Sequence, residues 1–277
     1  MPKTVRSLLL ASHPGPTVVV TLVAGVLGFG LAYAPARLLL LMAAILAGQL
    51  SIGWSNDWID AGRDAAVHRP DKPAAQGAVA VSVVRTSAFA AAAAMVVLSL
   101  LLGPLAALTH IVAVAMGWAY NLGLKNTPIS VLPYAVSFGL LPAVATLGQP
   151  VPQFPAPWVI VVGALLGVAA HFTNVLPDLA DDRDTGVRGL PHRLGARASG
   201  YIAFACVAVA TVILTFGPGP HPGPALLVGL VAGLVIVAVG VVLVARTNTT
   251  RILMRLIMAC ALIDVVMLAL AGQSTAL

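Results

Sequence analysis

The chain has 277 residues, of which 60% are hydrophobic and 9% charged, and it carries a formal net charge of +6. Soluble domains carry about 25% charged residues, so this composition excludes a water-soluble protein and indicates a polytopic membrane protein. In such a protein an excess of Lys and Arg marks cytoplasmic loops. We therefore expect the lipid bilayer as a partner and no nucleic acid.

The predicted elements are nine apolar segments, each near the ~17–25 residues that cross a bilayer as a helix. They cover residues 15–33, 38–55, 86–103, 105–122, 129–148, 157–176, 199–216, 224–245 and 252–272. The sequence therefore predicts an all-α fold, a polytopic membrane bundle of about nine transmembrane helices. The whole chain, residues 1–277, is expected to form a single transmembrane domain.

The connectors between these segments alternate between basic and non-basic, with Arg37 as the one exception. The connectors without Lys or Arg are the Gly- and Pro-rich ones at residues 103–104, 148–157 and 217–224. Because Lys and Arg accumulate in cytoplasmic loops, this pattern places the N-terminus inside the cell and the C-terminus outside. The two longest basic connectors, the loops 56–85 and 174–197, are then cytoplasmic.

The acidic residues are unusual in kind and in position. All nine are aspartates, and eight of them lie in two compact clusters. The clusters are Asp57, Asp60, Asp64 and Asp71, and then Asp178, Asp181, Asp182 and Asp184. Charge that only solubilises a surface would mix Glu with Asp and spread along the chain. Compact groups of hard carboxylate oxygens instead suit Mg²⁺.

The two clusters share one spacing. Asn56-xxx-Asp60-xxx-Asp64 recurs as Asn174-xxx-Asp178-xxx-Asp182. The first run follows segment 38–55 and the second follows segment 157–176, so four helices separate them and both point the same way. This pattern predicts two four-helix pseudo-repeats, related by an axis along the membrane normal, plus one additional helix.

A spacing of four residues places Asn56, Asp60 and Asp64 on one face of a helix. Like charges repel at that spacing, and a bound divalent cation reverses the repulsion. Mg²⁺ takes one or two carboxylates and fills its octahedron with water and phosphate oxygens. Two facing clusters with cations between them predict a diphosphate clamp. Its candidate cations are Arg63, Lys72, Lys125 and Arg183. The alternative, a pair of solvated helix-capping loops, does not explain why the two clusters match.

These residues carry a family resemblance. The run Asn56-Asp57-xx-Asp60-xxx-Asp64, with RPDKP at 69–73, resembles the first motif of the UbiA superfamily of intramembrane prenyltransferases. The stretch NVLPDLADDRDTGVRGLPHRLG at 174–195 resembles the second motif. The resemblance implies a central cavity, open sideways to lipid-like substrates, in which Mg²⁺ and a prenyl diphosphate bind.

The resemblance also implies roles for individual residues. The implied metal ligands are Asn56, Asp60, Asp64, Asp178 and Asp182, and the four aspartates among them are the candidate catalytic residues. The implied contacts to substrate are Asn56, Arg63, Lys72, Tyr120, Lys125, His171, Asn174 and Arg183. One departure concerns the family's Tyr-xxx-Lys element, because four residues separate Tyr120 from Lys125 here. Tyr120 therefore keeps an alternative interpretation as an interfacial aromatic.

Aromatic and polar residues inside the apolar segments are further candidates for contact with the substrates or for packing between helices. An allylic cation is stabilised by aromatic ring faces, and the candidate rings are Trp54, Trp58, Trp118, Phe138 and Phe172. His110 and Asp264 are interpreted as structural, because polar groups within a bundle form hydrogen bonds between helices. His13 is a candidate acceptor contact.

The function expected from these features is Mg²⁺-dependent transfer of a prenyl group from a prenyl diphosphate to a hydrophobic acceptor within the membrane. An aromatic or quinone-precursor acceptor is favoured, while a lipid-phosphate or tetrapyrrole acceptor stays open. One alternative is a UbiA-type membrane terpene cyclase, which needs no acceptor. The other is a membrane transporter, although transport sites lie near the bilayer midplane and these aspartates lie at helix ends.

Overall fold

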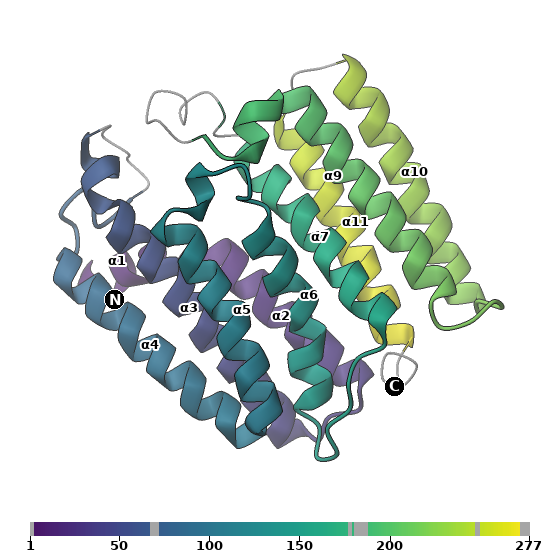
Figure 1. Ribbon diagram of the computed structural model, residues 1–277, viewed down its shortest axis with the longest axis horizontal. Coiled ribbons are helices and arrows are strands. Elements are labelled where there is room, and N and C mark those ends of the chain that lie inside the picture. The colour runs from purple at the N-terminus through teal and green to yellow at the C-terminus, as the bar shows by residue number, and fades with distance from the viewer. Residues whose placement is uncertain (1–2, 67–71, 177–178, 180–187, 247–249, 272–277) are drawn as a thin grey trace.

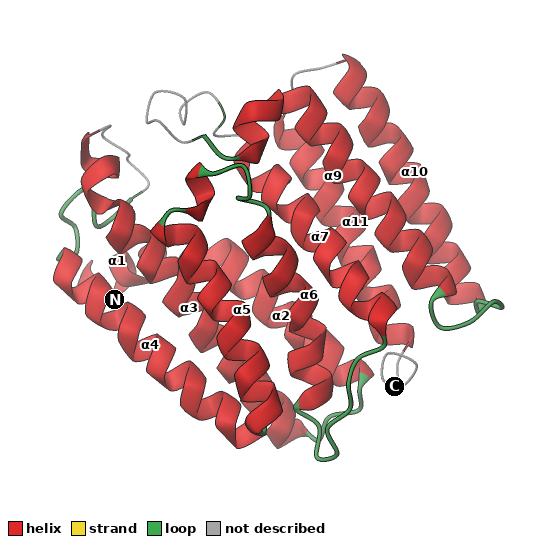
Figure 2. Cartoon of the chain, in the orientation of Figure 1, coloured by secondary structure: helices red, strands yellow, loops and turns green. Residues whose placement is uncertain are grey.

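The structure is a computed structural model that describes residues 3–66, 72–176, 179, 188–246 and 250–271. Over these ranges the chain consists of helices joined by loops (Figure 2). The elements are α1 (Lys3–Ala11), α2 (Pro14–Gly30), α3 (Pro35–Ala66), α4 (Val81–Leu102), α5 (Pro104–Leu122), η1 (Leu124–Asn126), α6 (Leu132–Leu147), α7 (Pro157–Val175), α9 (Leu190–Phe216), α10 (Pro224–Arg246) and α11 (Thr250–Ala271).

Proline begins many of these helices. α2, α3, α5, α7 and α10 each start at a proline, where the missing N–H costs no hydrogen bond and the ring presets a helical φ. Glycine separates α4 from α5, because Gly103 has a φ of 141°, which side chains rarely allow. The Gly-Pro pairs of the sequence therefore act as the turns that were predicted from them.

Each of the nine predicted segments coincides with an apolar helix, from α2 to α11. Within the described residues, seven helices are individually long and apolar enough to cross a membrane. The pair α1–α2, bent by 65°, would make an eighth span, and α6 is a shorter apolar helix. The predicted all-helical membrane bundle is thus confirmed, and the predicted number of nine transmembrane helices is approximate.

Two boundaries differ from the prediction. Residues 56–66, expected in a loop, continue α3, so the first aspartate cluster lies on a helix. Residues 190–197, also expected in a loop, belong to α9, which is kinked at Gly195 where φ is 82°. A further helix, α1, precedes the first predicted segment. Apolar length alone did not predict the end of α3 or the start of α9, because polar residues continue these helices beyond their apolar segments.

The helices form an inner ring with an outer layer (Figure 1). Around the ring, α2 packs on α3, then follow α5, α6, α7 and α11, and α11 returns to α2. Helix α4 covers α3 and α5, while α9 and α10 lie outside α7 and α11. Glycines permit the close approach of α7 to α6, because a Cβ at Gly163 or Gly167 would lie 2.5 or 2.4 Å from a carbonyl oxygen of α6. Small residues serve this purpose in membrane bundles.

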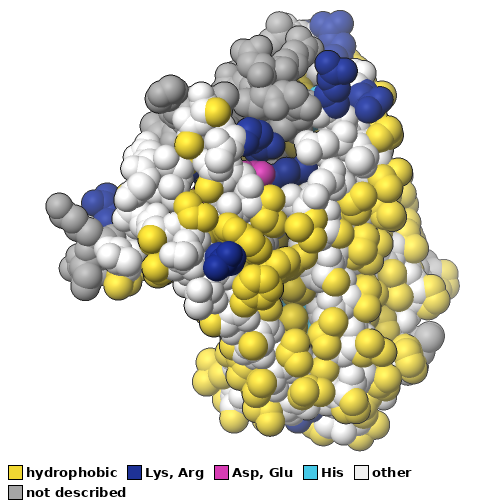
Figure 3. Space-filling model, turned by 60° about the vertical axis from the view of Figure 1, so that its left-hand side comes forward, with side chains coloured by type: hydrophobic (Ala, Val, Ile, Leu, Met, Phe, Trp, Pro, Cys, Tyr) yellow, Lys and Arg dark blue, Asp and Glu magenta, His cyan; other side chains and the backbone are white. Residues whose placement is uncertain are grey.

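The surface matches a bilayer environment. Figure 3 shows apolar side chains over most of the face in view, with Lys and Arg side chains gathered toward one end. Large apolar side chains on the outside include Phe29, 77% exposed, and Val228, 69% exposed. Such side chains are stable outside only in contact with lipid. The chain is an integral membrane protein.

The two ends of the bundle differ. α3 ends at Ala66 and α7 ends at Val175 on the same side (Figure 1), which we call the motif end. At the other side, the opposite end, Arg37 donates hydrogen bonds to the Leu102 and Gly148 carbonyls, at 2.5 and 2.7 Å. These carbonyls belong to the ends of α4 and α6, where cations are favourable. Arg37, the exception in the charge alternation, therefore has a structural partner.

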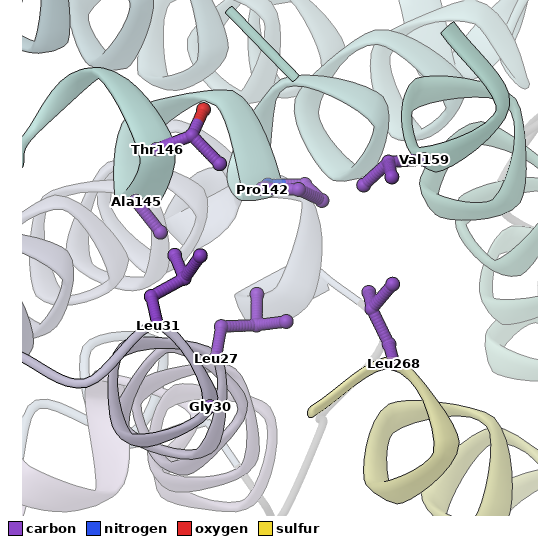
Figure 4. A pocket seen from close by; sticks show the side chains of 8 residues that line it. All are labelled: Leu27, Gly30, Leu31, Pro142, Ala145, Thr146, Val159 and Leu268. Atoms are coloured by element: carbon purple, nitrogen blue, oxygen red, sulfur yellow. The ribbon is translucent and has the colours of Figure 1, made fainter. Parts of the chain in front are cut away.

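A small apolar pocket of about 260 Å³ also lies at the opposite end (Figure 4). Side chains of α2, α6, α7 and α11 line it: Leu27, Gly30, Leu31, Pro142, Ala145, Thr146, Val159 and Leu268. Its one hydroxyl, on Thr146, bonds back to the Ala143 carbonyl at 3.4 Å. The side chains of the pocket are thus mostly apolar, and it lies at the end of the bundle away from the aspartates.

Candidate active site

The first aspartate cluster occupies the C-terminal turns of α3. Asp57, Asp60 and Asp64 are all buried, at 1%, 7% and 3% exposure. Carboxylates are unfavourable at this end of a helix, because the helix dipole is negative there. Burial strengthens the effect by removing water. The segment is therefore stable only with cations against it.

Asp60 is the most heavily compensated carboxylate. Lys125 Nζ lies 2.6 Å from its Oδ1 and 2.5 Å from its Oδ2. Arg63 Nη2 lies 3.1 Å from Asp60 Oδ2 and 3.6 Å from Asp64 Oδ1. Lys125 reaches this position from η1, because α5 ends at Leu122 and the chain turns at Gly123, where φ is 149°. The sequence prediction of Lys125 beside the first motif is consistent with this geometry.

Lys125 is itself buried, at 8% exposure. Burial lowers the pKa of its ammonium group, and the Asp60 carboxylate acts in the opposite direction. The pair is therefore mutually dependent: each charge lies in a low-dielectric setting that only its partner makes tolerable. A ligand that binds either group has to replace the other.

Asn56, one turn before Asp60, joins two networks. Its Nδ2 donates to Asp60 Oδ2 at 3.1 Å, and its Oδ1 accepts from Lys72 Nζ at 3.1 Å. Asn121 on α5 accepts from the same Nδ2 at 3.2 Å. Asn121 in turn donates to the Ile52 carbonyl at 2.9 Å and to Ser55 Oγ at 2.8 Å. Asn121 thus fixes the orientation of the Asn56 amide.

Asn121 was not identified from the sequence. Its signal was present, because it is a buried polar residue between Tyr120 and Lys125, within the family's third element. A polar residue near the end of a membrane helix defaults to a functional interpretation. The role of Asn121 follows from its contact with Asn56 on α3, which the sequence does not show.

Asp57 faces a different group of residues. Lys72 Nζ lies 3.6 Å from its Oδ1, and the Ala74 backbone N–H donates to its Oδ2 at 3.3 Å. The same Lys72 Nζ lies 2.9 Å from His13 Nε2, at the α1–α2 junction. Asp57 therefore holds the segment after α3 against the start of α2. His13 takes part in this contact, and Lys72 links it to Asn56.

The other half of the site consists of aromatic rings and a histidine. Asn174 Nδ2 donates to the Tyr134 hydroxyl at 3.1 Å. The Tyr120 ring lies 5.3 Å from that of Tyr134 and 5.8 Å from the His171 ring, with both contacts edge-on. His171 Nε2 lies 3.1 Å from Ser130 Oγ. Tyr120 is thus part of an internal cluster, together with Tyr134, which the sequence analysis did not identify.

The aromatic candidates separate into two groups. Phe138 stacks on Tyr134 with centroids 6.2 Å apart and so extends the internal cluster. Trp58 and Trp118 instead contact Phe89 of α4, at 5.6 and 5.2 Å. The remaining candidates have structural contacts: Trp54 Nε1 donates to the Leu8 carbonyl at 2.8 Å, and Phe172 is fully buried in the helix core.

All four aspartates of the second cluster lie outside the described residues. They are Asp178, Asp181, Asp182 and Asp184, and the same applies to Arg183 and to Asp71 of the first cluster. The residues that follow this cluster, from 188 onward, are described, and they contact the residues around Lys125. A Cβ at Gly189 would lie 2.6 Å from the Lys125 carbonyl oxygen, and the Leu190 N–H donates to Ser130 Oγ at 2.9 Å. The chain that follows the second cluster therefore contacts the loop that carries Lys125.

The first motif has a donor set that suits Mg²⁺. Over the described residues, no group of three or more His, Cys, Asp or Glu side chains is arranged to hold a metal. Mg²⁺ needs only one or two carboxylates when phosphate and water supply its other oxygens. Asp60, Asp64 and the Asn56 amide provide such oxygens in one buried strip, and Lys125 and Arg63 already supply positive charge there. The residues fit the ion.

The two polar residues interpreted as structural do make contacts between helices. Asp264 on α11 accepts a hydrogen bond from Thr211 Oγ1 on α9 at 2.9 Å. His110 Nδ1 on α5 lies 2.8 Å from Ser99 Oγ on α4. Both side chains are therefore integrated into the packing of the bundle.

Comparison with known proteins decides the family. The sequence model of the UbiA prenyltransferase family matches residues 17–263. The chain belongs to this family. The predicted resemblance is thereby confirmed, and with it the enzyme class, a prenyltransferase.

Individual relatives agree with the family. A curated relative is the bacteriochlorophyll synthase 33 kDa chain of Cereibacter sphaeroides, 30% identical over 213 residues. That match covers 67% of this chain and 66% of the relative, just under two thirds of its length. A UbiA homolog from Archaeoglobus fulgidus, bound to GPP and Mg²⁺, has a TM-score of 0.75 at 12% identity, covering 97% of this chain and 99% of its own. An apo UbiA homolog from Aeropyrum pernix K1 has a TM-score of 0.71 at 16% identity, covering 95% and 97%. The two solved structures establish the fold of this family member.

Proposed function

We propose that this UbiA family member catalyses Mg²⁺-dependent transfer of a prenyl group from a prenyl diphosphate to an aromatic or quinone-precursor acceptor. The observation that carries the proposal is the buried Asp60–Lys125 pair on α3 and η1, together with the half-buried Arg63 beside it. It combines oxygen ligands for a metal with cations for a phosphate in one place. Support for the donor comes from the homolog of Archaeoglobus fulgidus, which was solved with GPP and Mg²⁺.

The donor would bind with its diphosphate at the motif end. Lys125 and Arg63 now neutralise Asp60, and in the bound state they would turn toward phosphate oxygens. Asn56, Asp60 and Asp64 would hold Mg²⁺, which supplies positive charge to the leaving diphosphate when bound. From the second motif we propose that Asp178 and Asp182 hold metal and that Asn174 and Arg183 contact the donor. Lys72 would approach the diphosphate from beside Asn56.

The chain's own residues then support bond cleavage. The C–O bond between the prenyl group and the diphosphate breaks, and the electron pair leaves with the oxygen. Lys125 and Arg63 stabilise the charge that develops on that oxygen. The rings of Tyr120, Tyr134 and Phe138 lie together on the inner side of α5 and α6, where their faces would stabilise the allylic cation.

The acceptor completes the reaction. Its ring carbon forms the new C–C bond with the prenyl carbon, and the ring then loses a proton, which the departing diphosphate accepts. The apolar lining beneath the motif excludes water that would otherwise capture the cation. His171, beside Tyr120 and Tyr134, is proposed to contact the substrate on this side.

Two alternatives use the same donor site, and one of them has specific support. A tetrapyrrole acceptor is the second candidate, because the relative from Cereibacter sphaeroides is a bacteriochlorophyll synthase chain. A terpene cyclase would use the same donor site without any acceptor. We favour a smaller aromatic acceptor because the interior space beneath the motif is small and mostly lined by apolar side chains.

The orientation in the membrane is also a proposal. The alternation of basic and non-basic connectors supports a cytoplasmic motif end, an internal N-terminus and an external C-terminus. We propose that the whole chain forms a single transmembrane prenyltransferase domain, since the family match extends from residue 17 to residue 263. Fusion of a reporter to each terminus would test the sidedness. An N-terminal reporter active outside the cell would contradict it.

The decisive experiment measures diphosphate release by the purified protein in lipid nanodiscs. Allylic diphosphates of several lengths are supplied with Mg²⁺, with or without aromatic acceptors or a tetrapyrrole carboxylate. Release that requires an aromatic acceptor supports the proposal, and release with a tetrapyrrole alone supports the second candidate. Release with a hydrocarbon product and no acceptor indicates a cyclase. EDTA should abolish release and excess Mg²⁺ should restore it. Turnover unaffected by EDTA would contradict the metal assignment.

A further inference from the structure

A second space in the bundle lies deeper than the aspartates. It measures about 380 Å³ and lies between α2, α3, α5 and α6. Gln49 and Ile52 line it from α3. Gln49 precedes Asn56 by seven residues, which places it on nearly the same face of α3 and about 10 Å further from the motif end. The space therefore lies below the donor site, at the depth of the lipid hydrocarbon.

Most of the lining is apolar, and three side chains are polar. These are Gln49, His110 and Ser137. Ser137 Oγ is already satisfied, because it donates to the Ala113 carbonyl at 2.8 Å. His110 uses Nδ1 for its contact with Ser99 Oγ. Across the residues that the structure describes, no hydrogen-bond partner is found for His110 Nε2 or for the Gln49 amide.

His110 Nε2 is held against α3. A Cβ at Gly48 would lie 2.8 Å from this nitrogen, so only glycine leaves room for the ring. His110 is 3% exposed, and Gly48 is the neighbour of Gln49 in the chain. His110 and Gln49 thus both line the space, from α5 and α3 respectively.

Polar groups without partners are costly at this depth. The hydrocarbon region around the bundle supplies no hydrogen-bond partner, so an unpaired amide or imidazole gains one only from another group inside the space. A purely hydrocarbon ligand, such as a prenyl tail, would leave both groups unpaired. A ligand with a hydroxyl or carbonyl group would pair with them, because the amide both donates and accepts and the imidazole does either according to its tautomer.

We propose that Gln49 and His110 form a hydrogen-bonding subsite for a hydroxyl or carbonyl group of the acceptor. Identification of the ligand as the acceptor rests on the proposed function, whereas the subsite rests on the positions of Gln49 and His110. An aromatic ring bound there would place its polar substituent at Gln49 and direct its opposite edge upward, toward the donor. The subsite selects acceptors with an oxygen substituent, because an analogue without it leaves both protein groups unpaired.

A binding experiment tests the subsite without any turnover. The probe is 4-hydroxybenzophenone, which has a carbonyl and a hydroxyl and crosslinks to nearby C–H bonds on irradiation. Protein in phosphatidylcholine nanodiscs is irradiated with the probe, and labelled peptides of α3 and α5 are quantified by mass spectrometry against labelling of lipid-facing α10. We expect Gln49→Met, which keeps the side-chain length, to reduce labelling of α3 and α5 about fivefold.

A matched control and a second variant keep this result interpretable. Ser137→Ala alters the same lining but removes a hydroxyl that is already bonded within the protein, so labelling should stay within about twofold of wild type. Gln49→Leu repeats the loss with another apolar side chain, and monodisperse elution confirms folding. Equal labelling of wild type and Gln49→Met overturns the subsite. Absence of labelling on α3 and α5 in the wild type does so too.

The catalytic readout separates this inference from the proposed function. With 1,3-dihydroxynaphthalene as acceptor, Gln49→Met should lower kcat/KM about fivefold, whereas with 1-methylindole, which carries no hydroxyl or carbonyl group, the change should stay below about twofold. The KM and preferred length of the donor should not change. A shift in preferred donor length instead identifies a prenyl-tail site and overturns the inference. Gln49-dependent labelling in a protein that transfers to no acceptor would leave the subsite standing and reject the proposed function.

Discussion

The two ends of the bundle use the same kinds of polar residue in different ways. At the opposite end, Arg37 donates to the Leu102 and Gly148 carbonyls, and Tyr33 donates to the Ala145 carbonyl. At the motif end, Lys125 bonds to the Asp60 side chain, and the Tyr134 hydroxyl accepts from the Asn174 side chain. Arg37 and Tyr33 thus bond to backbone carbonyls, whereas Lys125 and Tyr134 bond to other side chains.

We interpret the side-chain bonds to backbone carbonyls as structural and the bonds between side chains as part of the functional site. A backbone carbonyl at a helix end is fixed by the fold, so a side chain bonded to it joins helices permanently. A side chain bonded to another side chain can exchange that partner for a ligand without unfolding the helix. The motif end is therefore where the protein can rearrange around a diphosphate. Matched substitutions at the two ends test this distinction.

The largest effect is expected for the buried carboxylates. Asp60→Asn removes the partner of Lys125 and a metal ligand, and we expect diphosphate release to fall by about 10³-fold. Its control is Asp264→Asn, because an amide oxygen still accepts the hydrogen bond from Thr211. Activity of the control should remain within about twofold of wild type. Equal loss in both variants would show that buried carboxylates contribute only to stability.

The cations provide the second comparison. Lys125→Met removes a phosphate contact and is expected to lower kcat/KM for the donor by about 10²-fold. Arg37→Met removes hydrogen bonds to two helix ends and should lower the midpoint of thermal unfolding while donor kinetics stay near wild type. Scanning fluorimetry and initial rates measure both properties. If Arg37→Met lost activity without losing stability, the opposite end could not be purely structural.

The amides should show a smaller difference. Asn121→Ala frees the Asn56 amide, and we expect about a tenfold loss in kcat/KM, as is usual when a residue that orients a metal ligand is removed. Gln149→Ala, which loses a 2.7 Å bond to the Leu31 carbonyl, should retain its rate. A titration of activity with Mg²⁺ is the sharper readout, since only Asn121→Ala should need more Mg²⁺. Identical titrations for both variants would remove Asn121 from the site.

The smallest effect is expected for the tyrosine hydroxyls. Tyr134→Phe keeps the ring but loses the contact with Asn174, and kcat should fall only a few-fold, because the ring face rather than the hydroxyl stabilises a cation. Tyr134→Leu should cost substantially more. In Tyr33→Phe the buried Ala145 carbonyl loses its donor, so stability should fall while the rate stays unchanged. A Tyr134→Leu enzyme as active as Tyr134→Phe would show that the ring is not required.

Much of the fold could be predicted from the sequence. The nine apolar segments correspond to α2 through α11, and Gly-Pro pairs separate them where turns were expected. Apolar length is a local property, so it can be counted without knowing what each helix contacts. The continuation of α3 through Asp64 and of α9 back to Leu190 was missed for the same reason. Those turns are stabilised by partners on other helices and not by lipid.

The candidate site was predicted in part. The four-residue spacing predicted one helical face for Asn56, Asp60 and Asp64, and all three lie on α3, although the helix was expected to end before them. Lys125, a predicted cation of the same site, lies beside Asp60. Asn121 and Tyr134 were missed, because their significance depends on the side chains opposite to them on α3 and α7. The aspartates of the second motif, which lie outside the described residues, stay a prediction.

By itself the sequence determined that the chain is a membrane bundle, and it identified the acidic repeat that we propose as the donor end of this prenyltransferase. Composition, apolar length and motif spacing are properties of the chain, and they hold whatever the helices contact. Only the tertiary structure decided which cation neutralises which carboxylate, and that Gln49 and His110 border one space. Those contacts depend on how α3 and α5 pack, because the neighbouring helix decides whether a buried polar group has a hydrogen-bond partner.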